Sequence, residues 1–154
     1  MIKLARIDHR LVHGQVAFAW TGHLNITRII VIDDASAGDE LKKMTINMAK
    51  PVGVKLNIFS ISEAIERMPK ILDLKDSVMM VFGTVHDAAE VLSGHPVVKE
   101  LNLGGIMKKE KSVQYGSAVY LDETEKSELK KLQDKGIKLF VQQVPNDPVK
   151  NITL

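Results

Sequence analysis

Residues 2–20 read IKLARIDHRLVHGQVAFAW, and this stretch predicts a strand, a polar turn and a helix in direct succession. The apolar run Ile2–Ile7 is typical of a strand, and Val16–Trp20 is typical of the start of a helix. Residues 6–16 contain two arginines, one aspartate, two histidines and one glycine. A strand-to-helix turn directs backbone N–H groups and the positive end of the helix dipole toward one point, which favours an anion. We therefore expect the functional site at this turn.

The rest of the chain continues this alternation of apolar runs and helical patterns. Further strands are predicted at 28–32, 54–59, 78–82, 97–103, 118–121 and 137–141, whereas 107–117 is predicted to be a loop with at most a short edge strand. This order indicates an α/β fold: a single domain over residues 1–154, with an open, mainly parallel β-sheet of about six to seven strands and helices on both faces. The tail, which contains Pro145 and Pro148, is predicted to lie on the surface.

Local signals predict several helix boundaries. Polar residues spaced three apart predict helix N-termini, namely Ser36 with Asp39, Ser60 with Glu63 and Thr84 with Asp87. Pro69 lies inside the helical pattern that follows Ser60. It is predicted to kink or shorten that helix, because proline lacks the N–H that a helix interior needs.

The composition narrows the class of protein. The hydrophobic fraction of 45% and the charged fraction of 26% are ordinary for a soluble globular domain. A net charge of +2 with no long basic run does not favour a nucleic-acid binder. The absence of cysteine excludes disulfides and cysteine-ligated zinc. No apolar run approaches the ~20 residues of a membrane span, and no signal peptide is evident, so we expect a soluble cytoplasmic protein.

Several polar residues and one glycine follow or end the predicted strands. In open α/β sheets, ligands bind beyond the carboxyl ends of the strands, where the strand order switches. We therefore expect one edge of the sheet to gather six residues, which are His13, Asp33, Thr84, Asn102, Gly104 and Gln142.

His13 is the candidate reactive residue of the turn. Its imidazole titrates near neutrality, so the neutral nucleophilic form is available in the cell. Arg6, Arg10 and Gly14 supply cations and accessible backbone where a phosphate would lie. The alternative is a turn histidine that only hydrogen-bonds locally.

Metal and nucleotide sites find less support. His9 and His13 are four residues apart and Asp8 could add a third ligand, but the nearby arginines would repel a cation. Asp33-Asp34 could bind Mg²⁺, although a strand-ending cap explains the pair more simply. Gly104-Gly105 is a weak candidate for a phosphate-binding turn, and the glycine-rich nucleotide motifs are absent. We therefore predict no metal and no cofactor.

The motif RIDxRLVHGQV at residues 6–16, with Trp20 one turn later, resembles the active-site signature of one known family. This is the enzyme IIB component of the mannose/fructose/sorbose family of the sugar phosphotransferase system (PTS). Supporting matches run along the chain at 28–34, 51–54, 102–105, 119–122 and 135–137. Position 9 departs from the pattern, since relatives often carry an acidic or amide residue there and this chain carries His9. This difference leaves the core of the motif unchanged but could alter the local charge.

The resemblance implies a protein-histidine–sugar phosphotransferase. His13 would accept a phosphoryl group through Nδ1 from phospho-IIA and pass it to a sugar that enters through the membrane components IIC and IID. The protein would lie in the cytoplasm, associated peripherally with the membrane through IIC and IID. Similar proteins often form homodimers. The transported sugar is not determined by this chain.

The expected site combines three catalytic residues with four that bind phosphate. His13, Arg10 and Asp8 form the first group, in which Asp8 is expected to orient Arg10 or the His13 ring. The phosphate-binding residues are expected to be Arg6, Gly14, Gln15 and Thr84. Two other functions stay open at this point: an anion-binding regulatory domain without chemistry, and a metal-dependent hydrolase that uses the two histidines and the aspartate pair.

Overall fold

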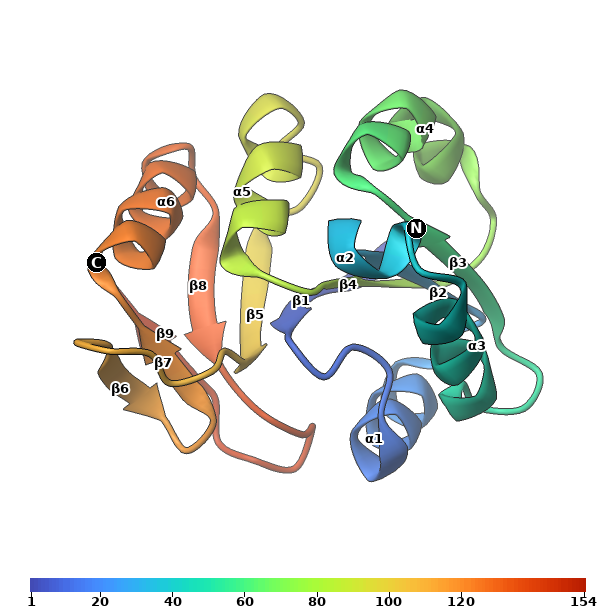
Figure 1. The fold of residues 1–154 in the computed structure, drawn as a ribbon, viewed down its shortest axis with the longest axis horizontal. Coiled ribbons are helices and arrows are strands. Elements are labelled where there is room, and N and C mark those ends of the chain that lie inside the picture. Colours follow the sequence, from blue (N-terminus) through green and yellow to red (C-terminus); the bar gives the residue numbers. More distant parts are fainter.

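The computed structural model describes all residues 1–154, and its centre is a seven-stranded sheet in the order β3-β2-β4-β1-β5-β8-β9 (Figure 1). The strands are β1 Ile2–Asp8, β2 Arg28–Ile32, β3 Lys55–Phe59, β4 Val78–Phe82, β5 Glu100–Gly105, β8 Lys138–Val141 and β9 Lys150–Ile152. Neighbouring strands pair in parallel except β8 and β9, which are antiparallel. The mainly parallel α/β sheet predicted from the alternating pattern is confirmed.

Helices cover both faces of the sheet (Figure 1). They are α1 Gly14–Leu24, α2 Asp34–Ala37, α3 Glu40–Ala49, α4 Ile61–Asp73, α5 Val85–Gly94 and α6 Glu123–Asp134. One core cluster contains residues of α4, α5 and α6, and a second contains residues of α1 and α3. No helix combines the length and the apolar character that crossing a bilayer requires.

The segment 107–117, predicted as a loop with at most a short edge strand, contains the short strand β6, and the strand predicted at 118–121 is confirmed as β7. β6 Val113–Gly116 and β7 Val119–Leu121 form a separate two-stranded antiparallel sheet. Val119 and Leu121 are buried in the core shared with α5 and α6, whereas Val113 is exposed. The hairpin therefore packs against the domain through β7.

One helix-cap prediction was wrong, the helix that contains Pro69 is not shortened there, and the tail, which lies largely on the surface as predicted, contains a strand that was not predicted. Asp39, not Ser36, caps α3, while Ser36 lies in the additional short helix α2, which Asp33 caps. α4 continues through Pro69, because its buried face of Ala64, Met68 and Ile71 stabilises the helix despite the missing hydrogen bond. The tail adds an edge strand, β9, whose three residues are too few to show a period in sequence.

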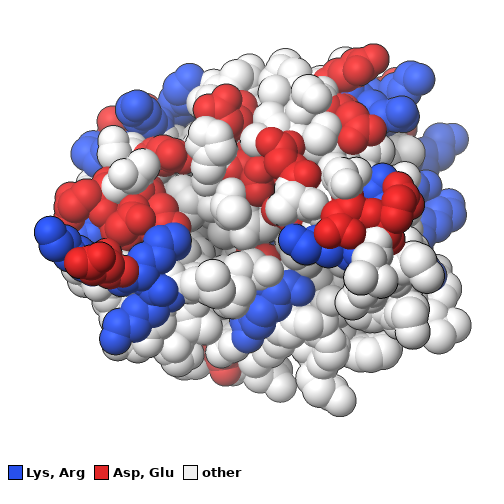
Figure 2. All heavy atoms as spheres, viewed as in Figure 1, with Lys and Arg blue, Asp and Glu red and all other residues white.

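The apolar residues of α3 do not all face the core. Ile46 is the buried residue of this helix, whereas Leu41, Met44 and Met48 share a face that is exposed to solvent. Figure 2 shows Lys and Arg intermixed with Asp and Glu over much of this side of the molecule, while the region over α1 carries few charges. The three apolar residues at helical spacing therefore do not form the packed face of this helix.

β1 is the point at which the connections of the sheet change direction. Helix α1 follows β1 and packs in the core cluster on one face. The connections that follow its neighbours β4 and β5 lead to α5 and α6 in the other core cluster. Connections that diverge from adjacent strands leave a crevice at the carboxyl edge, where ligands bind in this class of fold. The turn that carries His13 lies at this switch point.

Candidate active site

The alternation of β1 places two charged side chains on the face that α1 covers. Ala5 and Ile7 belong to the core cluster on the α5 side, whereas Leu4 belongs to the cluster on the α1 side. Because side chains alternate along a strand, Arg6 and Asp8 point to the same face as Leu4. Both are buried, at 2% and 0% relative exposure.

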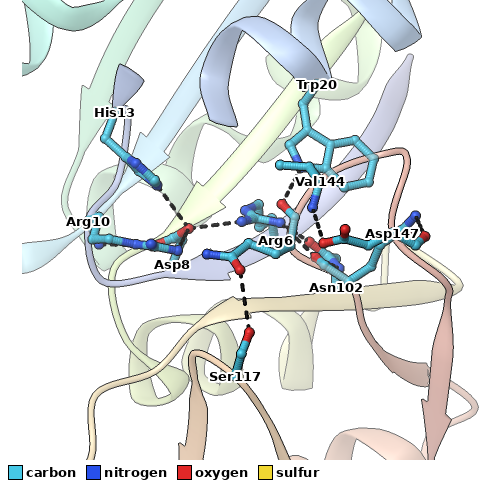
Figure 3. Close-up of polar contacts among 11 residues, drawn as sticks. Arg6, Asp8, Arg10, His13, Trp20, Asn102, Ser117, Val144 and Asp147 are labelled. Carbon is cyan, nitrogen blue, oxygen red and sulfur yellow. Dashed lines mark hydrogen bonds and ion pairs between the residues drawn. The ribbon is translucent and has the colours of Figure 1, made fainter. Parts of the chain in front are cut away.

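Asp8 is the centre of the site, and its carboxylate contacts the side chains of Arg6, Arg10 and His13 (Figure 3). Arg6 donates from Nη2 to Asp8 Oδ2 at 2.9 Å. Arg10 donates from Nε to Oδ1 at 3.0 Å and from Nη2 to Oδ2 at 3.1 Å, so that it grips the carboxylate with two bonds. His13 Nε2 lies 3.3 Å from Asp8 Oδ2.

The turn after Asp8 is tight, and its backbone supports this arrangement. The N–H groups of Arg10 and Leu11 donate to the side chain and the carbonyl of Asp8, respectively. Leu11 has φ 61°, a left-handed conformation that costs a non-glycine residue of order 1 kcal/mol. Gly14 has φ 36°, which explains the need for glycine there. The turn therefore stores strain where it brings His13 back over Asp8.

α1 begins at His13 without a side-chain cap. Its first backbone bond runs from Ala17 N–H to the His13 carbonyl. Each other helix has a side-chain cap, provided by Asp33, Asp39, Ser60, Thr84 and Asp122. The uncapped N–H groups at the start of α1 thus lie next to an imidazole, at the positive end of a helix dipole.

Arg6 lies beneath the carboxylate and not in the solvent-facing part of the site. Its Nη1 donates to Asn102 Oδ1 at 2.6 Å and to the Gln142 carbonyl at 3.0 Å. Its Cζ lies 5.7 Å from the ring centre of Trp20, within range of a cation–π interaction. The expected direct contact of Arg6 with phosphate is therefore not supported by its position, since its partners are all protein groups.

The two glycines at the end of β5 form the floor of the site and not a separate phosphate turn. A Cβ atom at Gly104 would overlap the Arg6 guanidinium, and one at Gly105 would lie 2.6 Å from Asp8 Oδ1. Both glycines belong to a strand that pairs with β1. Glycine is therefore required at both positions, because the side chains of Arg6 and Asp8 lie directly over the backbone there.

Replacing Gly104 with alanine is expected to destabilise the protein by about 2–3 kcal/mol, because the new methyl group would displace a buried, paired guanidinium. Gly22→Ala is the matched control, since no atom lies within 4 Å of the added Cβ. Gly22 is inside α1, so alanine there should stabilise by about 0.5–1 kcal/mol. Urea unfolding of both variants measures these changes, and an equal response at the two positions would contradict the close packing over β5.

The charges of the site set its protonation states. Burial raises the pKa of Asp8, but the hydrogen bonds and charges of Arg10 and Arg6 outweigh burial and hold this pKa below its usual value. Burial lowers the pKa of His13, Asp8 raises it, and Arg10 and Arg6 lower it, with a net result below the usual 6.5. At neutral pH, Asp8 is therefore ionised and His13 is neutral.

These protonation states define the reactive atom of His13. An ionised carboxylate can only accept a hydrogen bond, so His13 Nε2 must carry the proton that Asp8 accepts. The neutral ring then has its lone pair on Nδ1. His13 is partly exposed, with 27% of its side chain accessible. The predicted role of Asp8 as an orienting group agrees with this geometry, for both Arg10 and the ring.

The other predicted residues lie in different surroundings. Gln15 is exposed in the first turn of α1. The Thr84 hydroxyl donates to Asp87 Oδ2 and accepts from Asp87 N–H, so it caps α5. Asp33 accepts hydrogen bonds from Ser36. Of the six residues expected to gather at one edge, the structure joins His13, Asn102, Gly104 and Gln142 around Arg6 and Asp8, but engages Asp33 and Thr84 in caps.

His9 does not join His13 in a metal site. Its side chain is exposed and lines a neighbouring pocket of about 450 Å³ together with Thr84 and Lys109. No group of three or more His, Asp or Glu side chains is arranged to hold a metal ion. The hydrolase reading, which required these ligands, has no geometric support.

Sequence reasoning missed the groups that anchor Arg6. They are the backbone carbonyl of Gln142 and the ring of Trp20, which donates its own Nε1–H to the Gln143 carbonyl at 3.0 Å. One signal was present: Arg6 and Asp8 are two residues apart at the end of a predicted strand, so they had to share a face. Their partners come from the other end of the chain, and no local pattern identifies them.

Comparison with known proteins identifies the family. A family model described as the PTS system sorbose subfamily IIB component matches residues 2–154. The chain belongs to this family. The resemblance inferred from the RIDxRLVHGQV motif is thereby confirmed.

Relatives of this IIB family member match along nearly its full length. The sorbose-specific EIIB component of Klebsiella pneumoniae is 33% identical over 153 residues, covering 98% of this chain and 92% of that protein. The mannose-specific EIIAB component of Escherichia coli (strain K12) is 34% identical over 148 residues, covering 96% of this chain and 46% of that protein. The IIB chain thus spans about half the length of the EIIAB relative.

Solved IIB structures share the fold. The crystal structure of the IIBSor domain of the sorbose permease from Klebsiella pneumoniae superposes with a TM-score of 0.90 at 32% identity, covering 98% of this chain and 93% of that one. The N-acetylgalactosamine-specific IIB component 1 from Escherichia coli gives 0.92 at 28% identity, covering 99% and 100%. These matches support the single α/β arrangement described above.

Proposed function

We propose that this IIB component is a phosphocarrier of a PTS sugar-uptake system and that His13 carries the phosphoryl group. The observation that carries the proposal is the hydrogen bond from His13 Nε2 to the buried, ionised Asp8. This bond leaves a lone pair on Nδ1 of His13, which is itself the N-cap residue of α1 and makes no side-chain cap there. A nucleophile next to free donors is what phosphoryl transfer requires.

In the first step, the Nδ1 lone pair forms a bond to the phosphorus of a phosphohistidine on IIA. The P–N bond of the donor breaks, and its electron pair stays with the donor imidazole. The phosphorylated ring of His13 retains its Nε2–H, and Asp8 stabilises the positive charge that develops on it. In the second step, a sugar hydroxyl oxygen bonds the phosphorus and the P–Nδ1 bond breaks, with its electron pair returning to Nδ1. The hydroxyl proton passes to water.

Arg10 and the backbone at the start of α1 are proposed to hold the phosphoryl oxygens. Two Arg10 nitrogens bind Asp8, which leaves Nη1 for an incoming oxyanion. The N–H groups of Gly14 and Gln15 are the other proposed donors. Arg6 is proposed to act through Asp8, because both of its Nη groups bind protein groups. Thr84 could contribute only by leaving its cap with Asp87.

The proposed partners follow from the names of the relatives. The EIIAB relative contains a IIA part beside the matching IIB part, which supports phospho-IIA as the donor for this chain. The IIBSor domain belongs to a sorbose permease, which supports a membrane IIC/IID complex as the site of sugar transfer. We propose a cytoplasmic location at the membrane and include a homodimer as a possible assembly to test. The relatives name sorbose, mannose and N-acetylgalactosamine, so the sugar is left open.

The proposal is tested by incubating the protein with phosphoenolpyruvate, the general PTS carrier proteins and a matching IIA. The expected product is heavier by one phosphoryl group, carries it on His13, and loses it in acid but not in alkali. Addition of membranes that contain IIC/IID and a sugar should then discharge it. Reversible anion binding with no covalent product would instead support the anion-binding regulatory domain.

The pH dependence of stability gives a second check on His13. Because its pKa is lower in the folded protein than in the unfolded chain, the unfolded state binds the proton more tightly. Between the folded pKa and 6.5, stability therefore rises with pH, and it falls as the solution becomes more acidic. Asp8 does not titrate in this window, since its pKa lies below 3.8.

The wild type is expected to lose more stability than His13→Gln between about pH 7.5 and about pH 5.5. Urea unfolding at the two pH values measures this difference, and the NMR titration midpoint of His13 should lie below 6.5. A midpoint above 6.5, with the wild type gaining stability in acid relative to the variant, would show that Asp8 outweighs burial and the arginines.

A further inference from the structure

We infer that Asn102 is a positioning residue for phosphoryl transfer: it fixes the Arg6 guanidinium so that Asp8 stays aimed at His13 Nε2. The inference rests on the proposed function of His13. Asn102 lies on β5 directly opposite Arg6 of β1, and its side chain is fully buried. It does not touch the reacting imidazole, so any effect on transfer passes through Arg6 and Asp8.

The contacts form a continuous line from Asn102 to the reactive ring (Figure 3). Asn102 Oδ1 accepts from Arg6 Nη1 at 2.6 Å. Arg6 Nη2 donates to Asp8 Oδ2 at 2.9 Å, and the same Oδ2 lies 3.3 Å from His13 Nε2. Since a guanidinium is planar and rigid, fixing Nη1 also fixes the direction of Nη2.

The amide of Asn102 is suited to this position because it can both accept and donate. Its Nδ2 donates to the Gln142 carbonyl at 3.0 Å, and this carbonyl also accepts from Arg6 Nη1 at 3.0 Å. Arg6, Asn102 and Gln142 thus form a closed triangle in the protein interior. An aspartate could keep the bond to Arg6, but it would place a second carboxylate oxygen against the carbonyl.

The position of the carboxylate determines which ring nitrogen of His13 is free. Asp8 shares its two oxygens among Arg6, Arg10 and His13. If Arg6 turned away, Asp8 Oδ2 would lose its buried partner and could rotate off the ring. The His13 proton would then distribute between Nε2 and Nδ1, and a proton on Nδ1 blocks the nucleophile. Asn102 therefore acts on the tautomer of the ring.

Two substitutions separate this role from general packing. Asn102→Asp adds a negative charge that competes with Asp8 for Arg6, and it should raise the NMR titration midpoint of His13 by roughly 0.5–1 pH unit. Asn102→Ser removes the anchor without adding charge, so it should shift the ¹⁵N signals of the ring toward the Nδ1–H form. In both variants we expect the maximal rate of transfer from phospho-IIA to fall about tenfold, with an unchanged KM for the donor.

Asn57→Asp is the matched control. Asn57 on edge strand β3 accepts from Arg28 Nη1 at 2.6 Å, the same pair of side chains at the same distance as Asn102 and Arg6. Arg28 begins β2, whereas the site lies at the carboxyl ends of the strands. The control should leave the His13 titration and the transfer rate unchanged.

The wild type itself gives a test without any substitution. Its Arg6 Nη protons should show separate NMR signals and slow rotation, because both Nη groups are bound in the interior. A freely rotating Arg6 guanidinium, or Asn102 variants whose His13 titration and ring signals match those of Asn57→Asp, would overturn the inference. Phosphorylation of His13 in the wild type would then still support the proposed function. Conversely, a shifted His13 titration in the variants with no phosphorylation of the wild type would reject the phosphocarrier, and with it the role of Asn102 in transfer, and would leave only the effect of Asn102 on the His13 ring.

Discussion

His13→Ala is expected to abolish phosphorylation of this protein, with transfer from phospho-IIA reduced by at least ~10⁴-fold. The reason is chemical, because the covalent intermediate needs a nucleophilic nitrogen and the site contains no second nucleophile in contact with Asp8. The fold should persist, since the side chain is partly exposed and makes one hydrogen bond. Mass measurement after incubation with the phosphorylated donor gives the result directly.

His86→Ala is the control for this experiment. His86 lies on α5 with 62% of its side chain exposed, and its ring nitrogens lie near the carboxylates of Glu90 and Glu128. The His86→Ala variant should be phosphorylated at the wild-type rate. If His13→Ala still acquired one acid-labile phosphoryl group, the reactive residue would have to be sought elsewhere, with exposed His9 as the first candidate.

Asp8→Asn is expected to produce the second largest effect, because it damages both the chemistry and the fold. The new amide has one oxygen for two guanidinium groups, and its NH₂ group would face the His13 ring. That contact favours the Nδ1–H tautomer, so transfer should fall by about 10²-fold or more. The buried Arg6 would also lose its counter-charge, which should cost about 3 kcal/mol of unfolding free energy.

Single-turnover transfer and urea unfolding measure the two effects of Asp8→Asn separately. Asp39→Asn is the matched control, because Asp39 caps α3 and asparagine is an equally good cap. An Asp8→Asn protein with unchanged transfer would disprove the orienting role of the carboxylate. If only its stability fell, Asp8 would serve solely to neutralise Arg6.

Much of the site could be predicted from local sequence, because its parts lie in one strand–turn–helix unit. The apolar run to Ile7, the polar turn and the helix that begins near Gly14 are determined by neighbours in the chain. The prediction that His13 is the reactive residue depended on the same short motif, and so did the prediction that Asp8 orients the ring. Thr84 was correctly placed at the carboxyl edge of the sheet, but the sequence could not show that its hydroxyl already donates a hydrogen bond to Asp87.

What the sequence determined by itself was therefore the order of most elements, the α/β class and the family, and it pointed to His13 as the candidate reactive residue, since periodicity and a contiguous motif are local properties. Only the tertiary structure decided that Arg6 is buried, with its Nη groups bound to Asp8, Asn102 and Gln142. Its partners Asn102 and Gln142 lie 96 and 136 residues away along the chain. They meet Arg6 because strand pairing places β5 beside β1 and β8 beside β5. Burial and hydrogen-bond geometry depend on that pairing, and no short-range pattern in the chain contains it.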